Sequence, residues 1–282
     1  MAENSTLIDF DSVEKNLEHV HQRNLGVQQI PIDKIVGSIG RYADFTEGFR
    51  FHEDRISAKY ALVKQAMLDG KILPPIKVYQ ILDNYFVIDG HHRVTVAKST
   101  MGALEVDAEV IKIDFNIQLS PDKKYDYDTD QAKRFLIKLE EDAFQRETFI
   151  KNDILVHPLK VTDLTSFGKL FEEIKDFRKN YNDGEFAKKH IIFASYRWYE
   201  MRFLPAIKII MEEHILDGFA HRTYTDLYLW IQQHKYFLSQ QAGHDVGFDF
   251  TKDDFIHKYR KVKFLDILPG VFKDIVHKIK PT

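Results

Sequence analysis

The feature that most constrains the fold is a β-branched run that ends in Asp-Gly and passes directly into a helix-like segment, Val87–Lys98. The junction carries, in order, Asp89, Gly90, His91, His92 and Arg93. Glycine lets the backbone turn sharply and places no side chain in front of its N–H group. The first turn of a helix presents unpaired N–H groups and the positive end of the helix dipole. The sequence therefore predicts a strand, a tight turn and a helix whose N-terminus can hold an anion such as phosphate.

Each polar residue at this junction has a candidate role. We expect Gly90, His91, His92, Arg93 and Thr95 to contact phosphate, His91 to be catalytic as well, and Asp89 to bind a metal ion or take a proton. The alternative is a structural turn in which Asp89 caps the helix and the histidines are solvated. Two histidines and an arginine within four residues, behind a correctly placed glycine, favour the phosphate site.

A loop bracketed by two glycines, Gly37–Phe45, is the candidate for a second wall of the pocket. Ser38 and Gly40 are small enough to allow the backbone close to phosphates, and Arg41 lies beside them. A purely structural turn is the alternative here. The candidate catalytic acids of this region are Asp44 and Glu47, with Glu53 and Asp54 further along, although acidic residues in loops are usually only solvated.

Composition restricts the class of protein. A chain of 282 residues that is 44% hydrophobic can bury two cores, and its net charge of −3 provides no general attraction for nucleic acid. The absence of cysteine excludes disulfides, thiol redox chemistry and cysteine-bound zinc, and it is typical of a cytoplasmic protein. The first residues lack a basic region followed by an apolar core, and no later run approaches the ~18 apolar residues that span a bilayer, so we expect a protein that is neither secreted nor membrane-spanning. We expect no membrane partner.

The order of predicted elements gives an α+β class with a small mixed-sheet domain followed by a mainly helical one. We expect a helical arm over residues 1–26, an α/β domain over 27–116, a linker over 117–128 and a helical domain over 129–282. Predicted elements of the first half are a helix at 11–23, a strand at 27–32, a helix at 56–68, a hairpin at 76–88, a helix at 94–101 and a strand at 106–115.

Downstream, helical spacing predicts helices at 129–147, 162–180, 185–214, 223–241 and 252–259. Thr223–Asp226 is an acidic variant of the capping box, which fixes one helix start. Aromatic residues recur three and four positions apart on these helices. We interpret them as a packed core in preference to a base-stacking surface.

The segments 31–35, 73–78 and 87–98, with Gly102, resemble the N-terminal domain of ParB-type proteins, the ParB/sulfiredoxin fold. The resemblance covers Val27 to Phe115, about a third of the chain. Members share a nucleotide-binding turn of the form Gly-x-x-Arg followed by a small residue, which Gly90, Arg93 and Ala97 match. Sulfiredoxins need a cysteine in this turn, where the chain has His91, so sulfinic acid reduction is excluded.

The Asp-Gly-His-His-Arg sequence is most similar to the free serine kinases of this fold. The resemblance implies ATP or ADP with Mg²⁺ as cofactors, one carboxylate in the turn, matched by Asp89, and an upstream glutamate that acts on the substrate hydroxyl. That glutamate has no clean match among Asp44, Glu47 and Glu53, and the kinase sequence around it is absent.

Two main hypotheses follow. The first is an ATP- or ADP-dependent phosphotransferase, such as a kinase of a small hydroxylated metabolite, or a nucleotide hydrolase. The second is a ParB-like DNA-associated regulator or nuclease with a nucleotide switch. This second class needs a basic recognition helix after the α/β unit, and residues 130–147 are acidic on balance, so DNA is the less favoured partner. A catalytically silent scaffold with the helical tail as its interaction surface is a third reading, and a homodimer is left open.

Overall fold

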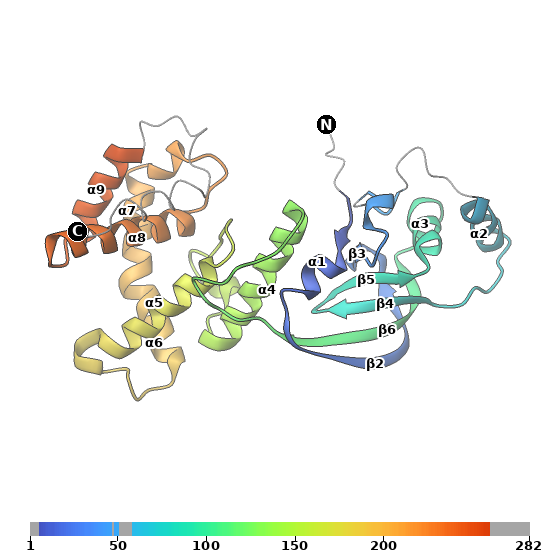
Figure 1. Cartoon of the computed structure of the whole chain (residues 1–282), viewed down its shortest axis with the longest axis horizontal. Coiled ribbons are helices and arrows are strands. Elements are labelled where there is room, and N and C mark those ends of the chain that lie inside the picture. Colours follow the sequence, from blue (N-terminus) through green and yellow to red (C-terminus); the bar gives the residue numbers. More distant parts are fainter. Residues whose placement is uncertain (1–5, 47, 51–57, 260–282) are drawn as a thin grey trace, which may run out of the picture. The chain divides into compact units, whose positions relative to one another are not determined.

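The computed structural model describes residues 6–46, 48–50 and 58–259. It divides into two compact units between Ala143 and Phe144 (Figure 1). The first unit contains a six-stranded mixed sheet with helices, and the second is helical. The predicted α+β class, a small mixed-sheet domain followed by a mainly helical one, is therefore confirmed.

The sheet has the strand order β1-β3-β5-β4-β6-β2. Its strands are β1 (Ile8–Asp9), β2 (Glu18–Pro31), β3 (Ile35–Ser38), β4 (Ile76–Ile81), β5 (Asn84–Asp89) and β6 (Glu105–Asn116). Pairs β1/β3, β3/β5 and β4/β6 are parallel, whereas β4/β5 and β2/β6 are antiparallel. The predicted hairpin is confirmed as β4 and β5. The parallel pairing of β3 and β5 brings the end of β3, Ser38, beside Val87 close to the end of β5.

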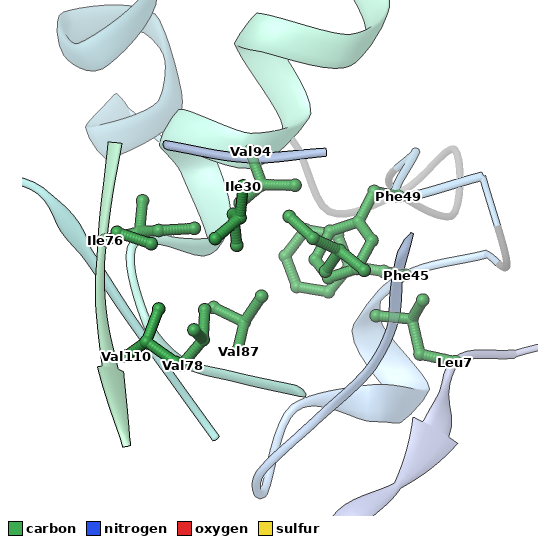
Figure 2. Packing of buried hydrophobic residues seen from close by; sticks show 11 residues of the cluster. Leu7, Ile30, Phe45, Phe49, Ile76, Val78, Val87, Val94 and Val110 are labelled. Carbon is green, nitrogen blue, oxygen red and sulfur yellow. The ribbon is translucent and has the colours of Figure 1, made fainter. Parts of the chain in front are cut away.

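Side chains alternate across β4 and β5, so each face of the sheet has its own core. On one face, Val78 and Val87 are opposite each other and pack with Val94 of α3 (His91–Ser99) and the rings of Phe45 and Phe49 (Figure 2). On the other face, Tyr79 and Phe86 are opposite each other. The ring of Phe86 contacts Phe10 of α1 (Phe10–Glu14) at 5.5 Å and Phe135 of α4 (Asp130–Thr148) at 5.4 Å.

The predicted helix over residues 11–23 is wrong beyond Glu14. Helix α1 ends there, and β2 begins at Glu18 and continues to Pro31. Almost all side chains of β2 are exposed, so no alternation of apolar and polar residues marks it as a strand. It is extended because its backbone pairs with β6 across eleven aligned positions, a contact between distant parts of the sequence. Helix α2 (Ala58–Leu68) lies where the sequence predicts it.

The second unit contains α5 (Ser166–Asn180), α6 (Ile191–Trp198), α7 (Leu204–Glu212), α8 (Tyr224–Ala242) and α9 (Phe248–Tyr259), and the last residues of α4 belong to it. The single helix predicted over residues 185–214 is wrong in two respects. Helix α6 begins only at Ile191, and a π-helical turn, Tyr199–Phe203, separates it from α7. Pro205 follows this turn and has no N–H group to give to the preceding turn, which accounts for the irregular hydrogen bonding there.

The predicted capping box is confirmed. Thr223 Oγ1 accepts a hydrogen bond from the amide of Asp226, and the Asp226 carboxylate accepts one from the amide of Thr223. The aromatic core is confirmed for Trp198, Phe203 and Tyr228, which are buried with ring centroids 5.0–6.2 Å apart. Phe193 and Tyr236 are exposed and do not belong to it. In the described part of the chain, no helix has the length and apolar character needed to cross a membrane.

Candidate functional site

The turn after β5 has the geometry that the sequence predicts. Gly90 adopts φ = 103° and ψ = 18°, a left-handed conformation, and α3 begins at the next residue. Gly90 is buried, and a Cβ placed on it would lie 2.5 Å from Cγ2 of Ile76. Only glycine satisfies both conditions without rearrangement.

The N-terminus of α3 has no side-chain cap among the described residues. The first backbone bond of the helix runs from the amide of Val94 to the carbonyl of Gly90. The amides of His91, His92 and Arg93 precede it and have no intrahelical acceptor, as in the first turn of any α-helix. No Ser, Thr, Asp or Asn side chain caps this helix start, and an uncapped helix N-terminus is the arrangement that anion sites use.

Arg93 closes the turn against the segment before β4. Its Nη1 donates to the carbonyl oxygens of Pro74 and Pro75, and its Nη2 donates to Asp89 Oδ2 at 2.7 Å. The Arg93 side chain is 15% exposed, whereas that of Asp89 is 67% exposed. Three guanidinium N–H groups therefore have acceptors within the protein. In this structure Arg93 fixes the shape of the turn, and Asp89 is held at its rim.

His91 occupies the centre of the predicted site. Its Nε2 lies 2.6 Å from Ser38 Oγ, a hydrogen bond between two buried side chains, and its ring stacks on Phe45 at 5.6 Å. Burial lowers the pKa of His91 to about 4, with a further decrease from Arg41 and opposing effects of Asp89 and Asp44. The imidazole is neutral at pH 7. Arg41, Asp44 and Asp89 are therefore all close enough to His91 to affect its charge.

The loop predicted over Gly37–Phe45 is wrong at its start, because Gly37 and Ser38 pair with β5 as part of β3. The second wall is formed by the end of β3 and the segment after it. Arg41 Nε donates to Asp44 Oδ2 at 3.0 Å, and its guanidinium lies 5.5 Å from the centroid of Phe45. The Arg41 side chain is 42% exposed. Gly40 has φ = 65°, and a Cβ placed there would meet open space among the described residues. Glu47, Glu53 and Asp54 lie outside the described residues.

His92 and Thr95 take other positions. His92 is buried, its ring lies 6.3 Å from that of Tyr60 of α2, and burial lowers its pKa with further contributions from Arg41 and Lys59. Thr95 Oγ1 donates to the carbonyl of His91 at 3.0 Å and is buried inside α3. The Thr95 hydroxyl, which the sequence predicted as a phosphate ligand, therefore bonds to the backbone of its own helix.

Sequence reasoning missed the acceptors of Arg93 and the aromatic partner of His91. Pro74 and Pro75 lie 19 and 18 residues before Arg93, and Phe45 lies on another segment. The sequence did contain a signal for the acceptors of Arg93, since a Pro-Pro pair before a strand fixes an extended backbone with accessible carbonyls. No pattern in the sequence indicated that Phe45 would stack on His91.

The helical unit matches a family model described as "Domain of unknown function (DUF4032)" over residues 159–260. A search of curated proteins found no match. Among solved structures, sulfiredoxin from Arabidopsis thaliana is similar with 15% identity and a TM-score of 0.24, covering 30% of this chain and 84% of that one. A Pnob8-like ParB-N domain is similar with 13% identity and a TM-score of 0.23, covering 92% of this chain and 98% of that one. The fold assignment rests on the sheet topology and not on these likenesses.

Proposed function

We propose that this chain binds a nucleotide with its phosphates at the N-terminus of α3, and that it transfers or hydrolyses the terminal phosphate of ATP or ADP. The observation that carries the proposal is the uncapped helix start behind the left-handed Gly90, with Arg41 close enough to affect both His91 and His92. Backbone amides, helix dipole and a fixed positive charge together are the usual means of holding phosphate.

The neutral histidines suit this role. A protonated imidazole beside Arg41 would be repelled, and burial already disfavours the charged form of both rings. A neutral ring keeps one N–H donor and one acceptor. We assign phosphate contact to the backbone amides of His91 and His92 and to Arg41, and we assign Arg93 the task of holding the turn.

Two carboxylates complete the proposed site. Asp89 and Asp44 both act electrostatically on His91, so both carboxylates lie close enough to the ring to affect its charge. We propose that Asp44 accepts the proton of the attacking hydroxyl or water, while Asp89 stays at the rim. The acceptor would be a small hydroxylated metabolite for a kinase and water for a hydrolase.

A magnesium ion fits this donor set only if the bound nucleotide supplies most of its ligands. Among the described residues, no three His, Asp or Glu side chains gather as a metal site. Mg²⁺ commonly uses one or two carboxylates together with substrate phosphates and water, and the exposed Asp89 can supply one such oxygen. The ion would neutralise charge that develops on the phosphate oxygens.

Replacing Arg41 with glutamine tests the proposal. We expect the affinity for the preferred nucleotide among ATP, ADP, CTP and GTP, with magnesium, to fall at least tenfold, since a charged hydrogen bond contributes about 1.5–3 kcal/mol. The measurement is isothermal titration calorimetry. The matched control is Arg23→Gln, which also removes an exposed arginine paired with an aspartate, here Asp114 on β6. Equal affinities of the two variants, or no nucleotide binding by the unaltered protein, would contradict the proposal.

A further inference from the structure

A hollow lies at the β1–β3 edge of the first unit, away from the start of α3. It encloses about 440 Å³, a size that suits a small molecule. Its walls come from β1, β3, the end of α3 and the first turns of α4. The lining side chains are Ile8, Asp33, Ile35, Val36, Lys98, Gln131, Arg134, Phe135 and Lys138. Lys98 is seven residues beyond His91 on α3, roughly 10 Å along the helix axis, so this hollow is separate from the proposed phosphate site.

One polar group in the hollow lacks a partner. The side chain of Gln131 is 9% exposed, and its Nε2 atom is buried without a hydrogen bond to any described residue. A buried amide that has lost its hydrogen bonds to water and gained no protein acceptor destabilises the folded chain. Gln131 lines the hollow, so rotation of its amide toward the hollow would let a ligand that brings an acceptor satisfy this donor.

The charge of the walls indicates the kind of acceptor. Three cations, Lys98, Arg134 and Lys138, face one carboxylate, Asp33. Lys138 shares Asp83 with Lys34 at 3.3 Å and 3.0 Å, respectively. Arg134 is exposed and has no hydrogen-bond or ion-pair partner among the described residues. The guanidinium of Arg134, which lines the same hollow as the unpartnered Gln131, favours an anionic oxygen.

The remaining walls are apolar. Ile8 and Ile35 are buried core residues, and Phe135 is 6% exposed with its ring against Phe86. An inorganic anion has no apolar surface to bury against these side chains, whereas a molecule with an apolar part would gain binding free energy by burying that part against them. We propose that this hollow binds a small organic anion, with its carboxylate or phosphate between Arg134 and the amide of Gln131 and its apolar part against Ile8, Ile35 and Phe135.

Octanoate is a suitable probe, with 1-octanol as the uncharged molecule of equal chain length and acetate as the charged molecule without the chain. We expect octanoate to shift the side-chain amide signals of Gln131 in ¹H–¹⁵N NMR spectra and to bind at least tenfold more tightly than either analogue. Equal affinities of octanoate and octanol, or Gln131 signals that do not move at 10 mM octanoate, about the range of weak ligands, would overturn the proposal.

Two variants separate binding from folding. Arg134→Gln should weaken octanoate about tenfold, whereas Lys133→Gln, one residue earlier on α4 and outside the hollow, should leave its affinity unchanged. Gln131→Leu should raise the melting temperature, because it removes the buried unpartnered amide, and should weaken octanoate. Unchanged octanoate affinity in Arg134→Gln, or a Gln131→Leu protein that binds octanoate as tightly as before, would overturn the proposal.

Discussion

Gly90→Ala is expected to destabilise the protein by about 2–5 kcal/mol. A left-handed backbone costs a residue with a Cβ about 1–2 kcal/mol, and overpacking in a filled site adds about 1–3 kcal/mol. Both terms apply, since Gly90 has φ = 103° and the new Cβ would lie 2.5 Å and 2.8 Å from two carbons of Ile76. The measurement is the free energy of unfolding in urea.

The control is Gly102→Ala. Gly102 also has a positive φ, 59°, but a Cβ added there meets nothing within 4 Å. This variant should lose only the backbone contribution, about 1–2 kcal/mol. If the two variants are destabilised equally, the close packing of the turn against Ile76 does not exist in solution.

The second large effect is a dependence of stability on pH that originates from His91. Its pKa falls from 6.5 to about 4 on folding, so folding favours the neutral ring. This contribution is complete above pH 6.5, where the unfolded chain is also neutral, and is lost as pH falls toward 4 because the unfolded chain binds the proton first. At 1.36 kcal/mol per pKa unit, the loss is about 3 kcal/mol.

His91→Gln isolates this effect from the titration of other groups. Glutamine offers an amide in place of the imidazole beside Ser38 and does not titrate. The difference in unfolding free energy between the unaltered protein and His91→Gln should therefore shrink by about 3 kcal/mol, in favour of the variant, from pH 7 to pH 4. His21→Gln, an exposed site on β2, corrects for removal of an imidazole in general. A difference that stays constant with pH would mean that His91 is not buried in neutral form.

Local patterns predicted the parts of this fold that are determined locally. The Asp-Gly turn, the hairpin of β4 and β5 and the capping box at Thr223 each depend on residues within a few positions of one another. The hydrogen bonds of these features join residues that are near one another in the sequence, so the residue types suffice to predict the features.

Contacts between distant segments were not predictable in the same way. Ser38 and His91 were both candidate site residues, but their 2.6 Å contact joins positions 53 residues apart and depends on the parallel pairing of β3 with β5. Part of strand β2 was predicted as a helix, because its exposed side chains do not alternate between apolar and polar and its extended conformation depends on pairing with β6. Arg93 was predicted as a phosphate ligand from its charge, and its bonds to Pro74 and Pro75 follow from tertiary structure alone.

The central claim is that the backbone amides at the start of α3 bind the phosphates of a nucleotide, and ¹H–¹⁵N NMR measures this directly. Titration with ADP and magnesium should move the backbone amide signals of His91 and His92 further than those of Lys98 and Ser99 at the other end of the same helix. Adenosine, which lacks phosphate, should leave the first two unmoved. If ADP leaves the His91 and His92 amides in place while shifting signals elsewhere, the nucleotide binds at another site and the account is wrong.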